Sequence, residues 1–441
     1  MSKIDIAGLK VDAITKKELL DGILGRIKNG QKTFVITPYS EFLYNSFGDP
    51  KLLEIFNRAD FSVADGIGLF WAKRFLDIPL TAKSYWGKIL QAAWQIKYSL
   101  AAIIFYPRWI KSALPEKIVG ADLVWDLAKL AADNNLSVYL LGGFGDTAEM
   151  TANQLISQSA NQLRVAGWSN KNPDDPSVIE EINQAAPDIL LVAYGPIKQE
   201  KWIAENLSKL NIKLAIGLGG SFDYIAGKKT APPKFIRYSG LEWLWRLITQ
   251  PYRAKRIFNA TFGLAICLLR YKIFMSYPIR ENVVIAILNS KNRILLGKKK
   301  PDQFKIDIIG DTDKVKRANY WQLPQGGTDG ESDLEKAARR EAREETNITS
   351  LKFINISNKR NEYTWNNALR KLLDNGSYKN KGQRQSVAYF RFIGNDDEIK
   401  LPKNEEFSEY QWAKIGELDK IVHPERRAVV RIVQEDLKDL A

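Results

Sequence analysis

Five short apolar runs, separated by longer amphipathic stretches, constrain the fold of the first half of this chain. The runs are residues 33–36, 61–64, 138–141, 189–193 and 214–217. Apolar runs of this length, bounded by turn residues, are typical of strands that are buried on both faces. Helical stretches between such strands favour parallel pairing. We therefore predict an α/β domain with a largely parallel sheet flanked by helices, a Rossmann-like arrangement.

Small residues follow each predicted strand. These turns are Thr37-Pro38, Asp65-Gly66-Ile67-Gly68, Gly142-Gly143, Gly195-Pro196 and Gly219-Gly220-Ser221. Ligands of parallel sheets bind beyond the carboxyl ends of the strands, and glycine turns let backbone N–H groups approach a phosphate. Asp65 is the candidate general base, since a carboxylate among small residues stays accessible to an attacking hydroxyl. A turn or helix N-cap aspartate is the alternative interpretation of Asp65.

The first half also resembles a known family, the WecG/TagA/CpsF glycosyltransferases, from about residue 4 to residue 256. The resemblance is carried by Thr37-Pro38 with Glu41-Phe42, residues 64–68, 120–123, 140–143, 195–202, 219–223, 231–233 and 240–247. It implies an inverting transfer that needs no metal or other cofactor. The sugar, often N-acetylmannosamine or its uronate, would pass from a UDP donor to a polyprenyl-diphosphate-linked N-acetylglucosamine.

The resemblance makes Asp65 the base and places Thr37 and Gln199 in the substrate pocket. The first half has no Asp-x-Asp metal pair near Asp65, so a diphosphate leaving group has to be stabilised by Arg, Lys and backbone amides. The candidate substrate-binding residues are Thr37, Gly143, Gln199, Glu200, Lys117, Arg237 and Arg246. Two departures leave the donor open: Tyr39 stands where the family usually has Asn, and Lys117 where an Arg is common.

Two aromatic, basic stretches predict contact with a membrane surface. Residues 81–114 form an insertion rich in Trp, Tyr and Ile, but lysines and arginines interrupt it, so it is too charged to span a bilayer. An interfacial helix or hairpin and a helix packed on its own domain or on a second subunit are equal alternatives. Residues 241–275 are similar, and their apolar part, 257–269, is expected to dock on or dip into the membrane.

Residues 326–348 predict a different chemistry, because a glycine-rich turn leads into a helix with three acids on one face. Glu341, Glu344 and Glu345 stand at i, i+3 and i+4. Carboxylates that close together repel each other, and an all-oxygen ligand set suits a hard cation such as Mg²⁺ or Mn²⁺. Arg340 is placed to orient them. An acidic surface helix is the alternative.

These residues resemble the Nudix box, which is matched by Gly326, Arg340, Glu341, Glu344, Glu345 and Ile348. The lead-in, residues 321–327, resembles that of RNA pyrophosphohydrolases and dinucleoside polyphosphate hydrolases. The resemblance implies an α+β domain, an α/β/α sandwich, that hydrolyses a nucleoside diphosphate derivative with Mg²⁺ or Mn²⁺. Glu344, Glu345 and Arg340 are then the candidate catalytic residues, and Glu341, Glu344, Glu345 and Glu406 the metal ligands.

Three departures from the Nudix box leave alternatives open. Ser332 replaces the first Glu of the box, while Ala342 and Asn347 replace an aliphatic residue and a glycine. The loss of the glutamate weakens the predicted metal affinity, so a non-catalytic ligand sensor is one alternative. An RNA-binding domain is another, since the chain carries a formal charge of +14.

The whole chain of 441 residues predicts two domains. We expect a glycosyltransferase domain at 1–256, an amphipathic membrane-proximal linker at 257–280 and a Nudix domain at 281–441. The single Cys267 fits a reducing compartment, and the N-terminus lacks the apolar core of a signal peptide. These features predict a cytoplasmic protein, peripheral at the inner face of the cell membrane, and we expect a homo-oligomer. The single His423 is expected to be structural.

Overall fold

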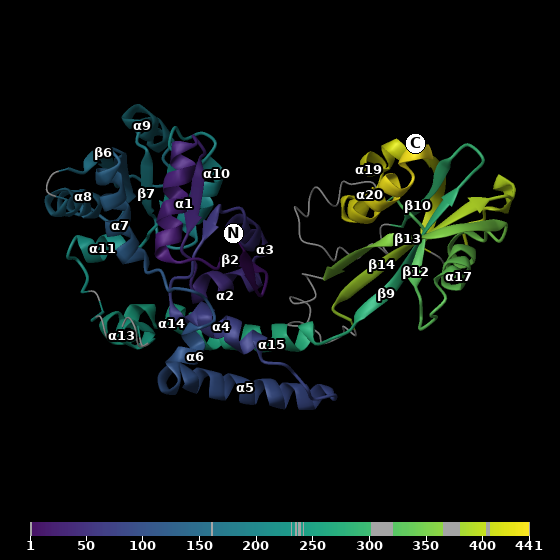
Figure 1. Cartoon of the computed structure of the whole chain (residues 1–441), viewed down its shortest axis with the longest axis horizontal. Coiled ribbons are helices and arrows are strands. Elements are labelled where there is room, and N and C mark those ends of the chain that lie inside the picture. The colour runs from purple at the N-terminus through teal and green to yellow at the C-terminus, as the bar shows by residue number, and fades with distance from the viewer. Residues whose placement is uncertain are drawn as a thin grey trace. The chain divides into compact units, whose positions relative to one another are not determined.

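The computed structural model divides the chain into two compact units, Met1–Ile273 and Phe274–Ala441 (Figure 1). It describes residues 2–159, 162–230, 232–233, 236, 240, 242–300, 321–364, 380–402 and 406–440. The predicted domain limits at 256 and 281 stay a prediction.

The first unit is built on six parallel strands in the order β4-β3-β8-β7-β5-β6. The strands are β3 (Thr33–Ile36), β4 (Phe61–Ser62), β5 (Ser137–Gly142), β6 (Arg164–Ser169), β7 (Ile189–Ala193) and β8 (Leu214–Gly217). All five strands predicted from apolar runs are present, and the parallel sheet is confirmed. The prediction missed β6, an edge strand that is mostly half-exposed and therefore lacks a continuous apolar run. It also missed the hairpin of β1 (Lys3–Ile6) and β2 (Leu9–Asp12).

Helices cover both faces of this sheet. On one face α1 (Lys16–Lys28), α7 (Gly120–Asp133) and α8 (Thr147–Gln158) bury Ile23, Leu127 and Leu155 against Leu140 and Leu191. α10 (Lys198–Asn206) packs on β8 and β3. The other helices are α2 (Ser40–Gly48), α3 (Pro50–Asn57), α4 (Ile67–Asp77), α9 (Ser177–Ala185) and α11 (Ser221–Ile225).

The predicted insertion is a long helix, α5 (Tyr85–Phe105), followed by the short α6 (Pro107–Lys111). In α5 the buried residues are small or polar, while large apolar side chains are exposed, which is the reverse of the usual pattern for a helix packed on a soluble domain. Ser99 accepts a hydrogen bond from the indole N–H of Trp71 on α4 at 3.0 Å. Trp86, Leu90 and Phe105 are 72%, 70% and 83% exposed. A helix was one of the predicted forms, and the outward apolar face is what the sequence could not locate.

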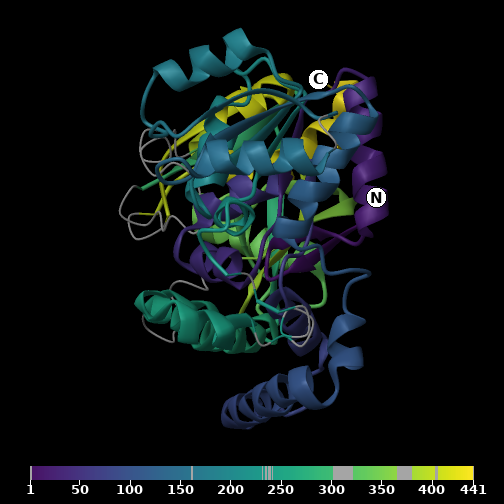
Figure 2. The same cartoon turned by 90° about the vertical axis from the view of Figure 1, so that its left-hand side faces the viewer.

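The segment after the sheet is helical. It comprises α13 (Glu242–Thr249), η1 (Pro251–Arg253), α14 (Ala254–Phe258), the π-helical turn η2 (Asn259–Gly263) and α15 (Leu264–Met275). Among the described residues one helix, Pro251–Met275, is long and apolar enough to cross a membrane by length and composition alone. It has 25 residues and is longer than the predicted apolar stretch 257–269. Figures 1 and 2 show α5 on the same side of the first unit as α14.

The second unit is an α/β/α sandwich, as predicted. Its mixed sheet has the order β11-β10-β9-β14-β13, with β12 beside β9 and β15 beside β10. The strands are β9 (Ile279–Leu288), β10 (Arg293–Lys299), β11 (Trp321–Gln322), β12 (Gln325–Gly327), β13 (Leu351–Thr364), β14 (Gly382–Phe392) and β15 (Phe407–Lys414). One face packs on α17 (Leu334–Thr346), and the other on α19 (Leu418–Ile421) and α20 (Arg427–Asp436). The smaller 3₁₀ turns are η4 (Asp396–Glu398), η5 (Ile415–Glu417), η6 (Pro424–Arg426) and η7 (Lys438–Leu440).

The ends of two strands in this unit, residues 358–364 and 382–385, differ from what their polar sequence indicates. The polar stretch 358–385 reads as a loop or helical insertion, yet β13 continues to Thr364 and β14 already begins at Gly382. Cross-strand hydrogen bonds explain how such polar residues extend the strands, since Asn361 donates to Gln385 at 2.7 Å and Tyr363 to Gln383 at 2.8 Å. Residues 365–379 lie outside the described part of the chain.

Candidate active sites

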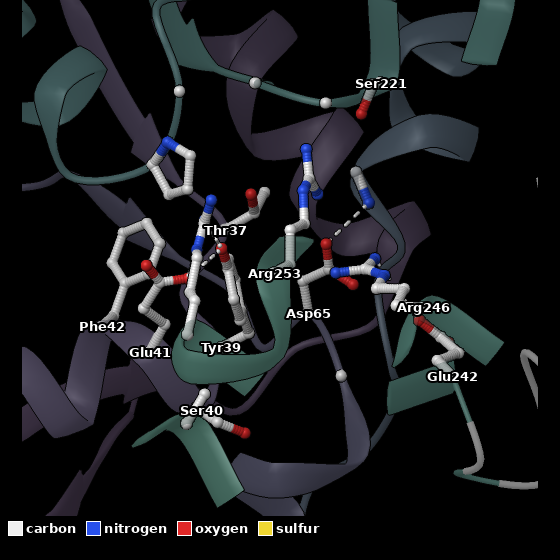
Figure 3. Close-up of a pocket in the computed structure, with 18 of the residues that line it drawn as sticks. Thr37, Tyr39, Ser40, Glu41, Phe42, Asp65, Ser221, Glu242, Arg246 and Arg253 are labelled. Carbon is white, nitrogen blue, oxygen red and sulfur yellow. Dashed lines mark hydrogen bonds and ion pairs between the residues drawn. The ribbon is translucent and has the colours of Figure 1, made fainter. Parts of the chain in front are cut away.

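The first unit has a pocket of about 850 Å³ at the carboxyl ends of its strands (Figure 3). This is near the upper end of the roughly 300–1,000 Å³ typical of small-molecule sites. Thr37 follows β3, Asp65 follows β4 and Gly143 follows β5. Gln199, at the start of α10, and Ser221, after β8, also line the pocket. The fold thus brings together turns that are far apart in the sequence.

Asp65 is a pocket carboxylate whose pKa is strongly perturbed by its surroundings. Part of its surface is open to the pocket, while the surrounding protein removes most of its solvent, and this burial raises its pKa to about 6. The negative charge of Glu242 raises the pKa further, and Lys117, Arg246 and the backbone N–H of Gly120 oppose the rise. The Gly120 N–H donates to Asp65 Oδ2 at 3.3 Å. A carboxylate in this state is a competent base near neutral pH.

Basic side chains enter the same pocket from two parts of the chain: Lys117 precedes α7, and Arg246 and Arg253 belong to the segment after the sheet. Lys117 and Arg246 both pair with Glu242, Arg246 at 3.7 Å. Arg253 also lines the pocket, and Figure 3 shows the side chains of Arg246 and Arg253 with Asp65 in one view. The pocket therefore has fixed cations close to its carboxylate, which suits a substrate that carries phosphate.

Tyr39 belongs to a hydrogen-bonded cluster that the sequence did not reveal. Its hydroxyl donates to Glu41 Oε2 at 2.8 Å and accepts from Arg256 at 2.9 Å, and Arg256 also donates to Glu41 at 2.6 Å. Glu41 and Arg256 are 215 positions apart in the chain. Their closeness depends on tertiary structure, so no sequence spacing could have indicated it.

Glu200 holds the turn before α10 and does not line the pocket. It is fully buried and accepts hydrogen bonds from the Ile197 N–H at 2.6 Å and from Gln199 Nε2 at 2.8 Å. Gln199 in turn accepts from the Gly219 N–H at 3.0 Å. Ile197 has a φ of +72°, which is strained for a β-branched residue, and the Glu200 contact stabilises it. Burial raises the pKa of Glu200 to about 7.

Of the predicted substrate-binding residues, Thr37, Gly143, Gln199, Lys117 and Arg246 line the pocket and Glu200 supports it from behind. Arg237 lies outside the described residues. Glu242 is a pocket residue that the prediction did not select. Arg253, one of the arginines that the sequence suggests for contact with lipid headgroups or the acceptor's diphosphate, also lines the pocket.

In the second unit Arg340 engages the acidic face of α17. It donates to Glu341 at 2.6 Å and to the Gly327 carbonyl at 2.8 Å, and lies 3.4 Å from Glu344. Asn347 closes the helix in the left-handed conformation with a φ of +60°, as expected for the residue in the place of a glycine. Arg340 thus orients two of the four predicted metal ligands, Glu341 and Glu344.

Glu345 is buried on the same helix, and its carboxylate accepts from the Gln325 N–H at 3.0 Å. Burial raises its pKa well above the usual range, and the nearby charges of Glu406 and Glu341 add to the rise. Burial likewise raises the pKa of Glu341. Glu406 pairs with Lys299 at 2.9 Å. Negative charge is therefore concentrated here, which is the condition that a bound cation relieves.

The donor chemistry of these glutamates fits a hard divalent cation. Within the described ranges, however, no three His, Cys, Asp or Glu side chains are already placed to hold a metal ion. Arg340 and Lys299 occupy several of the oxygens instead. The oxygens of these residues therefore fit such a cation by their chemistry, while Arg340 and Lys299 pair with them in this structure.

The fold and the pocket define the first unit as an α/β enzyme domain with a base and fixed cations at the carboxyl edge of a parallel sheet. The family model described as "Glycosyl transferase WecG/TagA/CpsF family" matches residues 4–99 and 87–277, and the chain belongs to this family. A NUDIX domain model matches residues 278–432. The chain is thus a glycosyltransferase that also carries a Nudix hydrolase domain.

Related proteins agree with this assignment of the first unit. The chain is 25% identical over 258 residues to the N-acetylglucosaminyldiphosphoundecaprenol N-acetyl-beta-D-mannosaminyltransferase of Staphylococcus aureus (strain MRSA252), covering 58% of this chain and 88% of that protein. The same enzyme of strain NCTC 8325 / PS 47 is 24% identical.

Among solved structures, an Ap4A hydrolase of C. elegans is 18% identical with a TM-score of 0.25, covering 36% of this chain and 98% of that one.

Proposed function

We propose that the first unit transfers N-acetylmannosamine, or a related N-acetylhexosamine or uronate, from a UDP-sugar to a polyprenyl-diphosphate-linked N-acetylglucosamine. The transfer inverts the anomeric centre and uses no metal ion. The observation that carries the proposal is Asp65, a carboxylate with a pKa of about 6 that faces a cationic pocket. The relatives in Staphylococcus aureus, named for this reaction, support the choice of substrates.

The reaction needs a base and stabilisation of the leaving group. Asp65 takes the proton of the attacking acceptor hydroxyl while the new bond to the anomeric carbon forms. The bond to UDP breaks on the opposite face, and UDP leaves with the electron pair. Lys117, Arg246 and Arg253 neutralise the diphosphate, a role that fixed cations perform without reorganisation. Gln199, held by Glu200, binds substrate.

The test is sugar transfer measured as lipid-linked disaccharide by mass spectrometry, in EDTA, for the wild type and for Asp65→Asn. The variant keeps the size of the side chain and an acceptor for the Gly120 N–H but cannot take a proton. Turnover in the wild type and loss in the variant are expected. Equal turnover in both would remove Asp65 as the base, and the absence of transfer from any N-acetylhexosamine or uronate donor would refute the proposed reaction.

We also infer that the first unit binds a membrane surface on the cytoplasmic side. The support is the outward face of α5, where Trp86, Leu90 and Trp94 are exposed beside lysines. The acceptor lipid requires such contact. Flotation with anionic liposomes tests this inference: wild type should float, and a variant with Trp86, Leu90 and Trp94 replaced by Gln should float less. Wild-type protein that stays at the bottom of the gradient would contradict it.

For the second unit we propose hydrolysis of a diphosphate linkage in a nucleoside diphosphate derivative, of the dinucleoside polyphosphate or RNA 5′-end type. Glu341, Glu344, Glu345 and Glu406 would hold Mg²⁺ or Mn²⁺, and Arg340 would position Glu341 and Glu344. Such a cation, when bound, activates water and neutralises the phosphate charge. Turnover of diadenosine tetraphosphate or 5′-triphosphate RNA with Mg²⁺, lost in Glu345→Gln, is the expected result.

A non-catalytic ligand sensor remains the competing function of the second unit. Ser332 in place of a glutamate and the engagement of Glu341 and Glu344 by Arg340 favour it. Binding of a nucleotide without turnover in Mg²⁺ or Mn²⁺ would decide for the sensor. Tight binding of RNA that weakens steeply with salt, again without turnover, would decide for RNA binding.

A further inference from the structure

The pocket of the first unit has an apolar wall that the transfer chemistry does not use. α5 contributes Leu100, Ile103 and Ile104, which stand at i, i+3 and i+4 and so share one helical face. The helical segment after the sheet contributes residues at similar spacing. They are Ile257, Ala260, Thr261, Phe262, Leu264 and Ala265. Two helical stripes therefore line the same cavity as Asp65.

This apolar wall begins close to the base. Ile67 lies two positions after Asp65 and also lines the pocket. A Cβ placed on Gly240 would lie 2.8 Å from a methyl carbon of Ile103 and 3.3 Å from one of Ile67, so these residues pack around the same point. The apolar lining thus begins beside Asp65, the base that takes the proton of the acceptor.

The wall also reaches solvent. Ile104 is 57% exposed and Phe262 is 53% exposed, and both line the pocket. α5 is held on α4 and α6, and η2 on α2, so each stripe is fixed by its own neighbours. On α5 the exposed Phe105 follows Ile104 directly and belongs to the outward apolar face of the helix. A chain-like apolar ligand could therefore run from the catalytic region to this surface.

We propose that this apolar wall, residues 100, 103 and 104 of α5 with residues 257, 260–262, 264 and 265, binds the first isoprene units of the acceptor's polyprenyl chain. The inference rests on the transferase activity proposed above and specifies its acceptor site. A soluble sugar nucleotide has no part that needs such a wall, whereas a prenyl diphosphate joins an anionic head to an apolar chain. The wall matches the apolar chain, and it lies in the same cavity as Asp65, the base that takes the proton of the acceptor.

The experiment compares two soluble acceptors that differ only in the chain. They are N-acetylglucosamine diphosphate esterified to farnesol and to ethanol, used without detergent and below the concentration at which the farnesyl ester aggregates. For the wild type we expect a KM at least tenfold lower for the farnesyl acceptor, because apolar burial adds to its binding. Equal KM values for the two acceptors would overturn the proposal.

The variant Ile104→Gln with Phe262→Gln removes apolar surface at positions that are already half exposed, so the fold should persist. It should raise the KM for the farnesyl acceptor about tenfold and leave the ethyl acceptor unchanged. The matched controls Leu90→Gln on α5 and Ile266→Gln on α15 change exposed apolar residues outside the pocket lining and should leave both KM values unchanged. An equal rise in the controls would contradict the proposal.

A binding measurement separates this inference from the transferase activity. Calorimetry with farnesyl diphosphate and with ethyl diphosphate reports the wall even when no acceptor is turned over. Preferential binding of farnesyl diphosphate that the double variant loses is the expected result. If the double variant instead converts a dimer to a monomer in sedimentation and binds both diphosphates as the wild type does, the surface belongs to a second copy of the chain and the proposal fails.

Discussion

The two sites of this chain suit diphosphate chemistry with opposite charge. In the first unit Lys117, Arg246 and Arg253 are built into a pocket around a single base, Asp65. In the second unit, on α17, carboxylates gather instead, and their raised pKa values reflect burial and mutual repulsion. In the functions proposed above, the first site supplies its own positive charge and the second obtains it from a bound cation. The same ligand group can therefore be handled by protein cations or by a bound metal, and the local charge indicates which.

The largest expected effect is the separation of the two activities by one substitution in each site. Asp65→Asn should lower transfer about a thousandfold and leave hydrolysis unchanged, because it removes a general base. Glu345→Gln should do the reverse. Both activities are measured on each purified variant. A variant that lowers both would show that the comparison of two independent sites is wrong.

Removal of a pocket cation should have the next largest effect. Arg246→Ala is expected to lower kcat/KM for transfer about a hundredfold, since it removes a charge that stabilises the leaving diphosphate. Arg164→Ala, on the exposed part of β6, is the matched control and should have no effect. Equal kcat/KM values for Arg246→Ala and the control would show that this pocket cation does not stabilise the leaving diphosphate.

A smaller effect is expected in the pH dependence of transfer. Asp65 has to be deprotonated to act as a base, so kcat/KM should fall below a pH of about 6, by tenfold per pH unit, and level off above it. Glu242→Gln removes a negative neighbour that raises the pKa of Asp65, and should move this limb to lower pH. Glu54→Gln, at an exposed ion pair with Arg58, should leave the limb in place. If the decline of kcat/KM at low pH stays at the same pH in Glu242→Gln, the assignment of this decline to Asp65 is contradicted.

The smallest expected effect concerns stability. The pKa of Glu200 is raised to about 7 in the folded chain from an ordinary value near 4.5, so ionisation opposes folding. Stability should therefore fall as the pH rises from about 4.5 to about 7. In Glu200→Gln this fall should be smaller, whereas Glu205→Gln, exposed on the same helix, should behave as the wild type. Urea unfolding at pH 5 and 7.5 gives the comparison, and identical pH dependence in all three proteins would refute it.

Much of this arrangement could be predicted from the sequence because it depends on local patterns. The buried strands β3, β5, β7 and β8 contain continuous apolar runs. Thr37 and Gly143 lie in the turns after β3 and β5, and Gln199 lies at the start of α10, after β7. The charge environment of Asp65 could not be predicted. Glu242 comes from a helix far along the chain, and the contact of Arg256 with Glu41 spans 215 positions. The outward apolar face of α5 was also hidden, since composition does not show which side of a helix packs.

The central claim is that the site of the first unit uses protein cations, whereas the site of the second unit needs a bound metal ion. A metal titration of the wild-type protein tests this claim most directly. Transfer to the farnesyl acceptor and hydrolysis of diadenosine tetraphosphate are followed in the same sample, first in EDTA and then with increasing free Mg²⁺. The account predicts a constant rate of transfer throughout and hydrolysis that appears only as Mg²⁺ is added. Transfer that stops in EDTA and returns with Mg²⁺ would contradict it.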